Sequence, residues 1–205
     1  MRLVLTLLCC AVVLAGCQEP DGSPDRSDPL AAGFDDTVSA VVQQQIDDGV
    51  PASPLGRVLD TCPALDDQGL AALAAIIDVA GEDVEILRAT VSDPGGANTL
   101  SCPLRFSEAS AGAIVLSVGP TADTVQGVRD MMVAQDFEEV EVDSIQGLPP
   151  EQVLLFDATR FMASRAIWTR DGFQISLTAN ADIVDEGRLL ALLPVAVAEV
   201  TRVLG

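Results

Sequence analysis

The sequence contains no histidine, no lysine and no tyrosine, and its only tryptophan is Trp168. Without histidine the chain has no imidazole base, no serine-histidine pair and no ordinary nitrogen ligand for a metal ion. Without lysine it can form neither a Schiff base nor a P-loop. These absences exclude most of the common hydrolase and transferase mechanisms.

Paired carboxylates could still hydrolyse glycosides without histidine. Sugar-binding clefts usually offer aromatic platforms, however, and the pattern around Trp168 is more typical of a core residue. The sequence therefore predicts a protein that is not an enzyme, with no catalytic residues and no cofactor. A carboxylate-based hydrolase is the weaker alternative.

No hydrophobic run is long enough to span a bilayer, which takes about 20 helical residues. The run from Leu3 to Leu14 is about a dozen residues long, is broken by Thr6 and follows the positively charged Arg2. A charged start before a short apolar core is typical of a secretory signal peptide, which we place at residues 1–16.

The signal peptide ends in the letters LAGC, residues 14–17. This resembles the bacterial lipobox, whose cysteine receives diacylglycerol, becomes the new N-terminus and is usually acylated again with a chain such as palmitate. Two or more chains anchor a protein stably, whereas one does so only marginally. The sequence predicts a lipoprotein anchored through Cys17 to the extracytoplasmic face of the cell membrane; an ordinary signal peptide with an incidental cysteine is the alternative.

Residues 18–33 are rich in proline, glycine and aspartate and have almost no apolar residue before Leu30. Such a stretch cannot bury enough surface to offset its ordering entropy. We therefore predict the lipidated cysteine and a disordered linker at 17–34, followed by a single domain at 35–205.

Acidic residues dominate the charge of the chain. Removing residues 1–16 removes Arg2 and leaves 10 arginines against 31 acidic residues, a net charge of −21. This charge repels nucleic acid and favours cationic partners or simple solubility.

Two of the five cysteines remain once Cys9 and Cys10 leave with the signal and Cys17 carries lipid. An even remainder in an exported protein indicates a disulfide, here between Cys62 and Cys102. The alternative, a redox pair, usually has a CxxC spacing that this chain lacks.

Periodicity and turn signals predict an α+β fold, in which an antiparallel β-sheet has helices packed on one face. We expect helices at 35–49, 66–80, 121–135 and 185–204, the last with Pro194 kinking it or starting a second helix. We expect strands at 84–91, 99–106, 113–118, 136–144, 152–157, 164–170 and 173–179.

The last two strands are the most secure prediction, because Asp171 and Gly172 form a favoured two-residue hairpin turn. That register places Trp168 opposite Ile175 on an apolar side. The opposite, polar side then carries Arg165, Thr169, Gln174, Ser176 and Thr178.

Several motifs together resemble a known family. They are the lipobox, the polar linker, DTCPALDDQGLAAL (60–73), SCPLRF (101–106), VDSIQGLP (142–149), the AIWTRDGFQISL hairpin (166–177) and a last apolar helix. Their order resembles the uncharacterised actinobacterial lipoproteins of the DUF3558 type over residues 60–205. The resemblance implies an envelope lipoprotein with an α+β domain and no established activity.

Acidic clusters are the remaining polar groupings. Glu139, Glu141 and Asp143 would alternate on one face of the predicted strand 136–144, where a cation or an arginine would relieve their repulsion. No cluster matches a calcium loop of the DxDxDG type. A solvated strand face is therefore the favoured interpretation, and a cation site the weak alternative.

Two functions remain open. The first is a non-catalytic binding or interaction module that presents an acidic domain to a partner protein in the cell envelope. The second is a carrier or sensor that holds a lipid or small apolar ligand between the sheet and its helices. The sequence identifies no ligand-binding residue for either.

Overall fold

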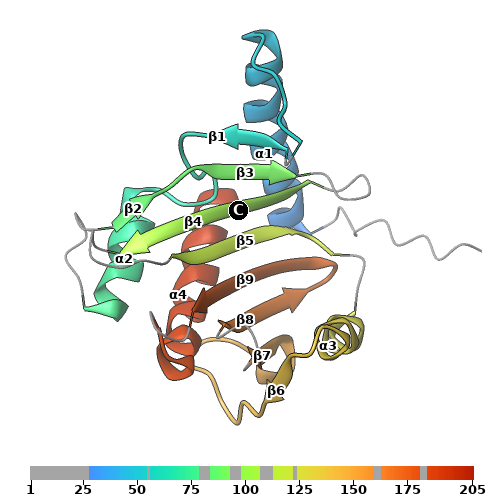
Figure 1. Ribbon diagram of the computed structural model, residues 1–205, viewed down its shortest axis with the longest axis vertical. Helices are drawn as coiled ribbons and strands as arrows, with labels where there is room; N and C mark the ends of the chain where they lie inside the picture. Colours follow the sequence, from blue (N-terminus) through green and yellow to red (C-terminus); the bar gives the residue numbers. More distant parts are fainter. Residues whose placement is uncertain are drawn as a thin grey trace, which may run out of the picture.

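A computed structural model gives the fold of the chain (Figure 1). It describes residues 28–54, 56–78, 84–92, 98–106, 113–121, 124–158, 163–180 and 184–205. The predicted signal peptide, Cys17 and most of the predicted linker lie outside these residues.

The described residues form an open antiparallel sheet of nine strands with four α-helices and a 3-10 turn, so the predicted α+β class is confirmed. The helices are α1 (Pro29–Asp47), α2 (Asp67–Ile77), α3 (Val125–Ala134) and α4 (Glu186–Leu204), and the 3-10 turn is η2 (Pro150–Gln152). The strands are β1 (Arg57–Leu59), β2 (Val84–Ile86), β3 (Ala89–Ser92), β4 (Thr99–Phe106), β5 (Ile114–Pro120), β6 (Glu138–Val140), β7 (Val153–Ala158), β8 (Ala163–Arg170) and β9 (Phe173–Asn180).

The sheet runs in the order β1-β3-β4-β5-β9-β8-β7-β6, and β2 also pairs with β4. Side chains alternate between its two faces, as the burial pattern of β4 shows most regularly. One face carries the main core and is covered by α4, which passes behind the strands in Figure 1, with α2 packed on α4. We call this the helix face, and the opposite side the outer face.

Helix α3 covers one end of the outer face. Val128 and Met132 of α3 form a second, smaller core with Leu154, Phe156 and Ile167 of β7 and β8. These strand residues alternate with Leu155, Ala166 and Trp168, which belong to the main core. The sheet therefore has its main helical layer on one face, as predicted, and a local cover on the other.

Helix α1 begins six residues before the predicted position, so residues 28–34 belong to the domain and not to the linker. Asp28 caps the helix through the backbone N–H of Leu30, at 2.9 Å, and its carboxylate also accepts from Arg170 at 3.2 Å. Phe34 is fully buried with its ring against Phe173, the centroids 5.5 Å apart. The prolines suggested a linker, but Pro29 occupies the first turn, where proline is tolerated.

Close packing fixes the same helix to the end of the chain. A Cβ atom at Gly33 would lie 1.6 Å from the carbonyl oxygen of Leu204, so only glycine allows this approach of α1 to α4. The C-terminal helix is a single helix that contains Pro194, which resolves the two alternatives left by the sequence.

One predicted helix is shorter than expected, and one predicted strand is divided in two. Helix α2 is capped by Asp66, where the predicted helix begins, but it ends at Ile77, because Asp78 takes a left-handed conformation with φ of 63°. The last two residues of the predicted helix, 79 and 80, lie outside the described residues. The predicted strand 84–91 is two strands, β2 and β3, that both pair with β4.

The β8–β9 hairpin has the predicted register, with Trp168 opposite Ile175 across a turn at Asp171 and Gly172. Both turn residues have positive φ, of 49° and 78°, as such turns require. Trp168 is buried as predicted, and its indole N–H donates to Gln152. The polar side of the hairpin differs from expectation, because Thr169 and Ser176 are buried there too.

Candidate functional site

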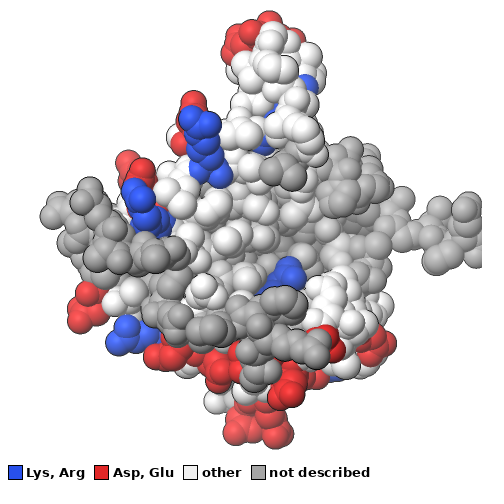
Figure 2. All heavy atoms as spheres, viewed as in Figure 1, with Lys and Arg blue, Asp and Glu red and all other residues white. Residues whose placement is uncertain are grey.

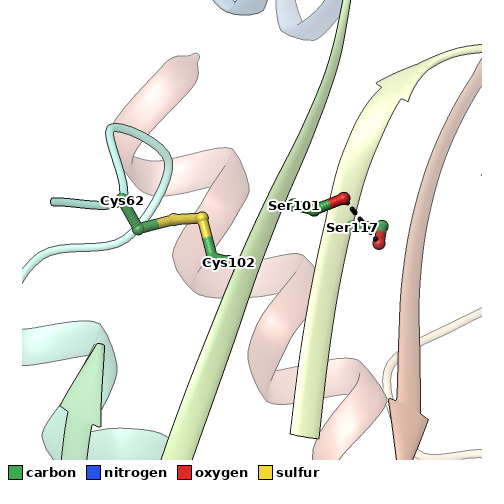
Figure 3. The surroundings of a disulfide bond; sticks show 4 residues. All are labelled: Cys62, Ser101, Cys102 and Ser117. Carbon is green, nitrogen blue, oxygen red and sulfur yellow. Dashed lines mark hydrogen bonds between the residues drawn. A yellow bond between two sulfur atoms is a disulfide. The ribbon is translucent and has the colours of Figure 1, made fainter. Parts of the chain in front are cut away.

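The predicted disulfide is present and joins Cys62 to Cys102 (Figure 3). Cys102 lies on the helix face in the middle of β4, and Cys62 lies in the segment that leads into α2. Both cysteines are buried. The bridge therefore holds the start of α2 against the sheet, which positions α2 beside α4.

A solvent-open groove of about 620 Å³ lies along the side of α4 that faces away from the sheet. Its floor is formed by Leu190, Ala191, Pro194, Val195 and Ala198. Ile76 of α2 and Ile145 of the segment after β6 form its walls. Most of the lining is apolar, and Ile76 is 38% exposed.

The groove does not lie between the sheet and its helices, where a ligand pocket was predicted. The α4 residues that face the sheet, which include Leu193 and Ala196, are fully buried in the core. The groove residues of α4 form a second apolar stripe, on a different side of the helix from the buried core residues. This second stripe is visible in the sequence, because α4 has few polar residues on any side.

An ion-pair network holds one end of the groove. The guanidinium of Arg202 in α4 donates to Asp66, the cap of α2, at 2.5 Å and to Glu199 at 2.8 Å. The hydrogen bond from Arg202 lowers the pKa of Asp66, and the same bond raises the pKa of Arg202. The network joins the two helices that frame the groove, and Glu199 itself lines it.

The other side of the groove adjoins the most acidic segment of the described chain. Glu138, Glu141 and Asp143 are exposed, and the segment runs directly into the lining residues Ser144 and Gln146. Figure 2 shows acidic side chains gathered at the lower edge of the view, where Figure 1 places β6 and the segment that follows it. The apolar groove is therefore flanked by negative charge.

The predicted alternation of Glu139, Glu141 and Asp143 on one strand face is wrong, because β6 ends at Val140. Among the described strands β6 pairs only with β7, and Glu138 lies opposite Asp157 in that pairing. Like charges directly opposite each other destabilise a strand pair.

Glu139 is held by an arginine. The Nε atom of Arg129 donates to both of its carboxylate oxygens, at 2.9 and 2.7 Å, and these bonds raise the pKa of Arg129. Glu139, Glu141 and Asp143 do not form a group able to hold a metal ion, and no other described His, Cys, Asp or Glu residues form one.

Comparison with protein families, with curated proteins and with solved structures finds no match to this chain. None of the described helices is both long enough and apolar enough to cross a membrane. Lipidation at Cys17 and the resemblance to DUF3558-type lipoproteins therefore stay predictions.

Proposed function

We propose that the protein is a membrane-anchored extracytoplasmic lipoprotein that acts as a non-catalytic binding module in the cell envelope. The lipobox at residues 14–17 supports the anchor. The Cys62–Cys102 disulfide supports export, since such bonds persist in oxidising compartments and are rare in the cytosol.

The observation that carries the binding role is the open apolar groove on α4. Contiguous exposed apolar surface with a polar or charged margin marks interaction sites in soluble domains. Ile76 remains 38% exposed in the wall of the groove, although the core residues of the same helix, α2, are buried. Burying this wall and the floor formed by α4 provides the driving force for association.

We propose that the partner is a segment of an envelope protein with one apolar side and basic residues beside it. An amphipathic helix lays its apolar side into a groove of this kind. The exposed Glu141 and Asp143 beside the groove complement basic residues on the partner. Their charge would also increase the rate of association, and salt would weaken this effect.

The alternative is a carrier for a lipid or small apolar ligand, which the apolar lining of the groove favours. Its volume of about 620 Å³ lies within the range of ligand sites. The groove is open to solvent along α4, however, whereas a ligand pocket buries most of its ligand. Native mass spectrometry of the protein purified from its host would detect a retained lipid.

Site-specific photo-crosslinking tests both functions in the native host. Benzoylphenylalanine in place of Ala191, an exposed residue of the groove floor, should give an adduct of protein mass after irradiation. The same replacement at Ala134, an exposed residue of α3 outside the groove, is the matched control. The crosslinked peptide should contain apolar and basic residues.

An adduct of lipid mass at position 191 would favour the carrier. Equal labelling at positions 191 and 134, or no adduct at position 191, would count against the groove as a binding site.

A further inference from the structure

The outer face of the sheet carries a row of hydroxyl groups on three neighbouring strands. Ser101 of β4 lies opposite Ser117 of β5, which in turn lies opposite Ser176 of β9. The Ser101 and Ser117 Oγ atoms are 3.5 Å apart. Figure 3 shows these two serines on the side of the sheet opposite the disulfide. The row therefore lies on a different surface from the α4 groove.

The row ends at the guanidinium of Arg165. Its Nη2 atom donates to the Oγ of Ser176 at 3.3 Å, and its Nη1 atom contacts the Sδ of Met132 in α3 at 3.6 Å. The Nε atom is buried and has no hydrogen-bond partner. Arg165 also lies opposite Phe156 of the small core, so its stem is surrounded by apolar side chains.

These contacts leave the guanidinium under-satisfied. A guanidinium has five N–H donors and always carries a charge, so burial usually requires a carboxylate or phosphate partner. Arg165 has a neutral hydroxyl and a weakly accepting thioether instead. Burial without a compensating acid lowers the pKa of Arg165.

Among the residues that the structure describes, no carboxylate pairs with Arg165, and this does not reflect a shortage of acids. The chain has 31 acidic residues against 11 arginines, and Arg105, Arg129, Arg170, Arg188 and Arg202 each pair with a carboxylate. In Figure 2, acidic side chains gather at the margins, and the described atoms near the centre of this face are mostly uncharged. An apolar residue at position 165 would pack in the small core without the cost of burying a charge.

We infer that the guanidinium of Arg165, oriented by Ser176, binds the oxyanion group of a polar ligand, either a carboxylate or a phosphate. The free guanidinium donors suit two oxygens of one such group. The Ser176 hydroxyl accepts from Arg165 and is itself fully buried, so it holds the guanidinium in place and leaves the remaining donors for the ligand. Ser117 and Ser101 lie farther from the Arg165 guanidinium, on β5 and β4. There their hydroxyl groups would contact the uncharged part of the ligand.

Titration with inorganic phosphate and, separately, with acetate tests the site, with chloride holding the ionic strength constant. The Nε–H NMR signal of Arg165 should shift saturably with at least one of the two anions. The melting temperature should rise by about 3 to 6 °C at an anion concentration ten times the dissociation constant. Saturation by phosphate alone assigns a phosphate ligand, and saturation by acetate assigns a carboxylate.

Variants separate a specific site from a general effect of anions. Arg165→Met should abolish the rise in melting temperature, and without added anion it should be at least as stable as the wild type. Arg88→Met removes the same charge from an exposed position and should respond like the wild type.

If Arg165→Met does not fold, Arg165→Lys keeps the charge without the five-donor geometry and should bind about tenfold more weakly. The inference is overturned if neither anion saturates the wild type below about 0.1 M. It is equally overturned if Arg165→Met, or Arg165→Lys in its place, responds like the wild type.

Discussion

Alanine in place of both Cys62 and Cys102 should lower the free energy of unfolding by about 4 kcal/mol. The two cysteines are 40 residues apart, and the bridge removes the conformational freedom of that loop from the unfolded chain. Alanine is the appropriate replacement, because both positions are buried and serine would bury a hydroxyl group. The measurement is urea denaturation of the wild type and the double variant.

The wild type treated with a reductant is the control for this experiment. It retains both sulfur atoms but loses the bridge, so it should unfold at nearly the same urea concentration as the double variant. If reduction leaves the midpoint unchanged, the bridge does not stabilise the domain.

Phe34→Ala should lower the free energy of unfolding by about 3 to 5 kcal/mol. Phe34 is fully buried and lies edge-on against Phe173 of the β8–β9 hairpin, so its removal leaves a cavity between α1 and the sheet. Ile46→Ala in the same helix is the matched control. Ile46 is 48% exposed, so its replacement should change the free energy by about 0.5 kcal/mol or less.

The comparison of these two variants tests where the domain begins. Residues 28–34 were predicted to be linker, whereas the structure makes them the cap and first two turns of α1. Equal, small losses of stability in the two variants would show that this part of α1 does not pack on the sheet.

Elements with strict local patterns are the ones that the sequence predicted well. In β4, buried and partly exposed residues alternate from Thr99 to Phe106, and both ends were predicted correctly. The β8–β9 hairpin followed from Asp171 and Gly172, whose turn fixes the register of both strands. The disulfide followed from counting the cysteines of a chain predicted to be exported.

Elements that depend on distant partners were missed. Strand β1 has three residues and forms only because it pairs with β3. The start of α1 was read as linker, since the contacts that hold Asp28 and Phe34 come from Arg170 and Phe173, far along the chain. The end of β6 depends on the unpaired edge of the sheet, which periodicity does not reveal.

The two candidate binding surfaces were missed for the same reason. Periodicity shows that α4 is apolar on more than one side, but it does not show which side another element covers. Arg165 was placed on a polar strand face, where an arginine is ordinarily solvated. Only the packing of α3 over that face half-buries the side chain against Met132.

The proposed function depends on export with a lipid at Cys17. The most direct test is the intact mass of the protein extracted from the membranes of its native host, alkylated without prior reduction. We predict a chain that begins at Cys17, carries at least two acyl chains and has no alkylated thiol. A mass for residues 1–205 without lipid, or alkylation of Cys62 and Cys102, would contradict the account.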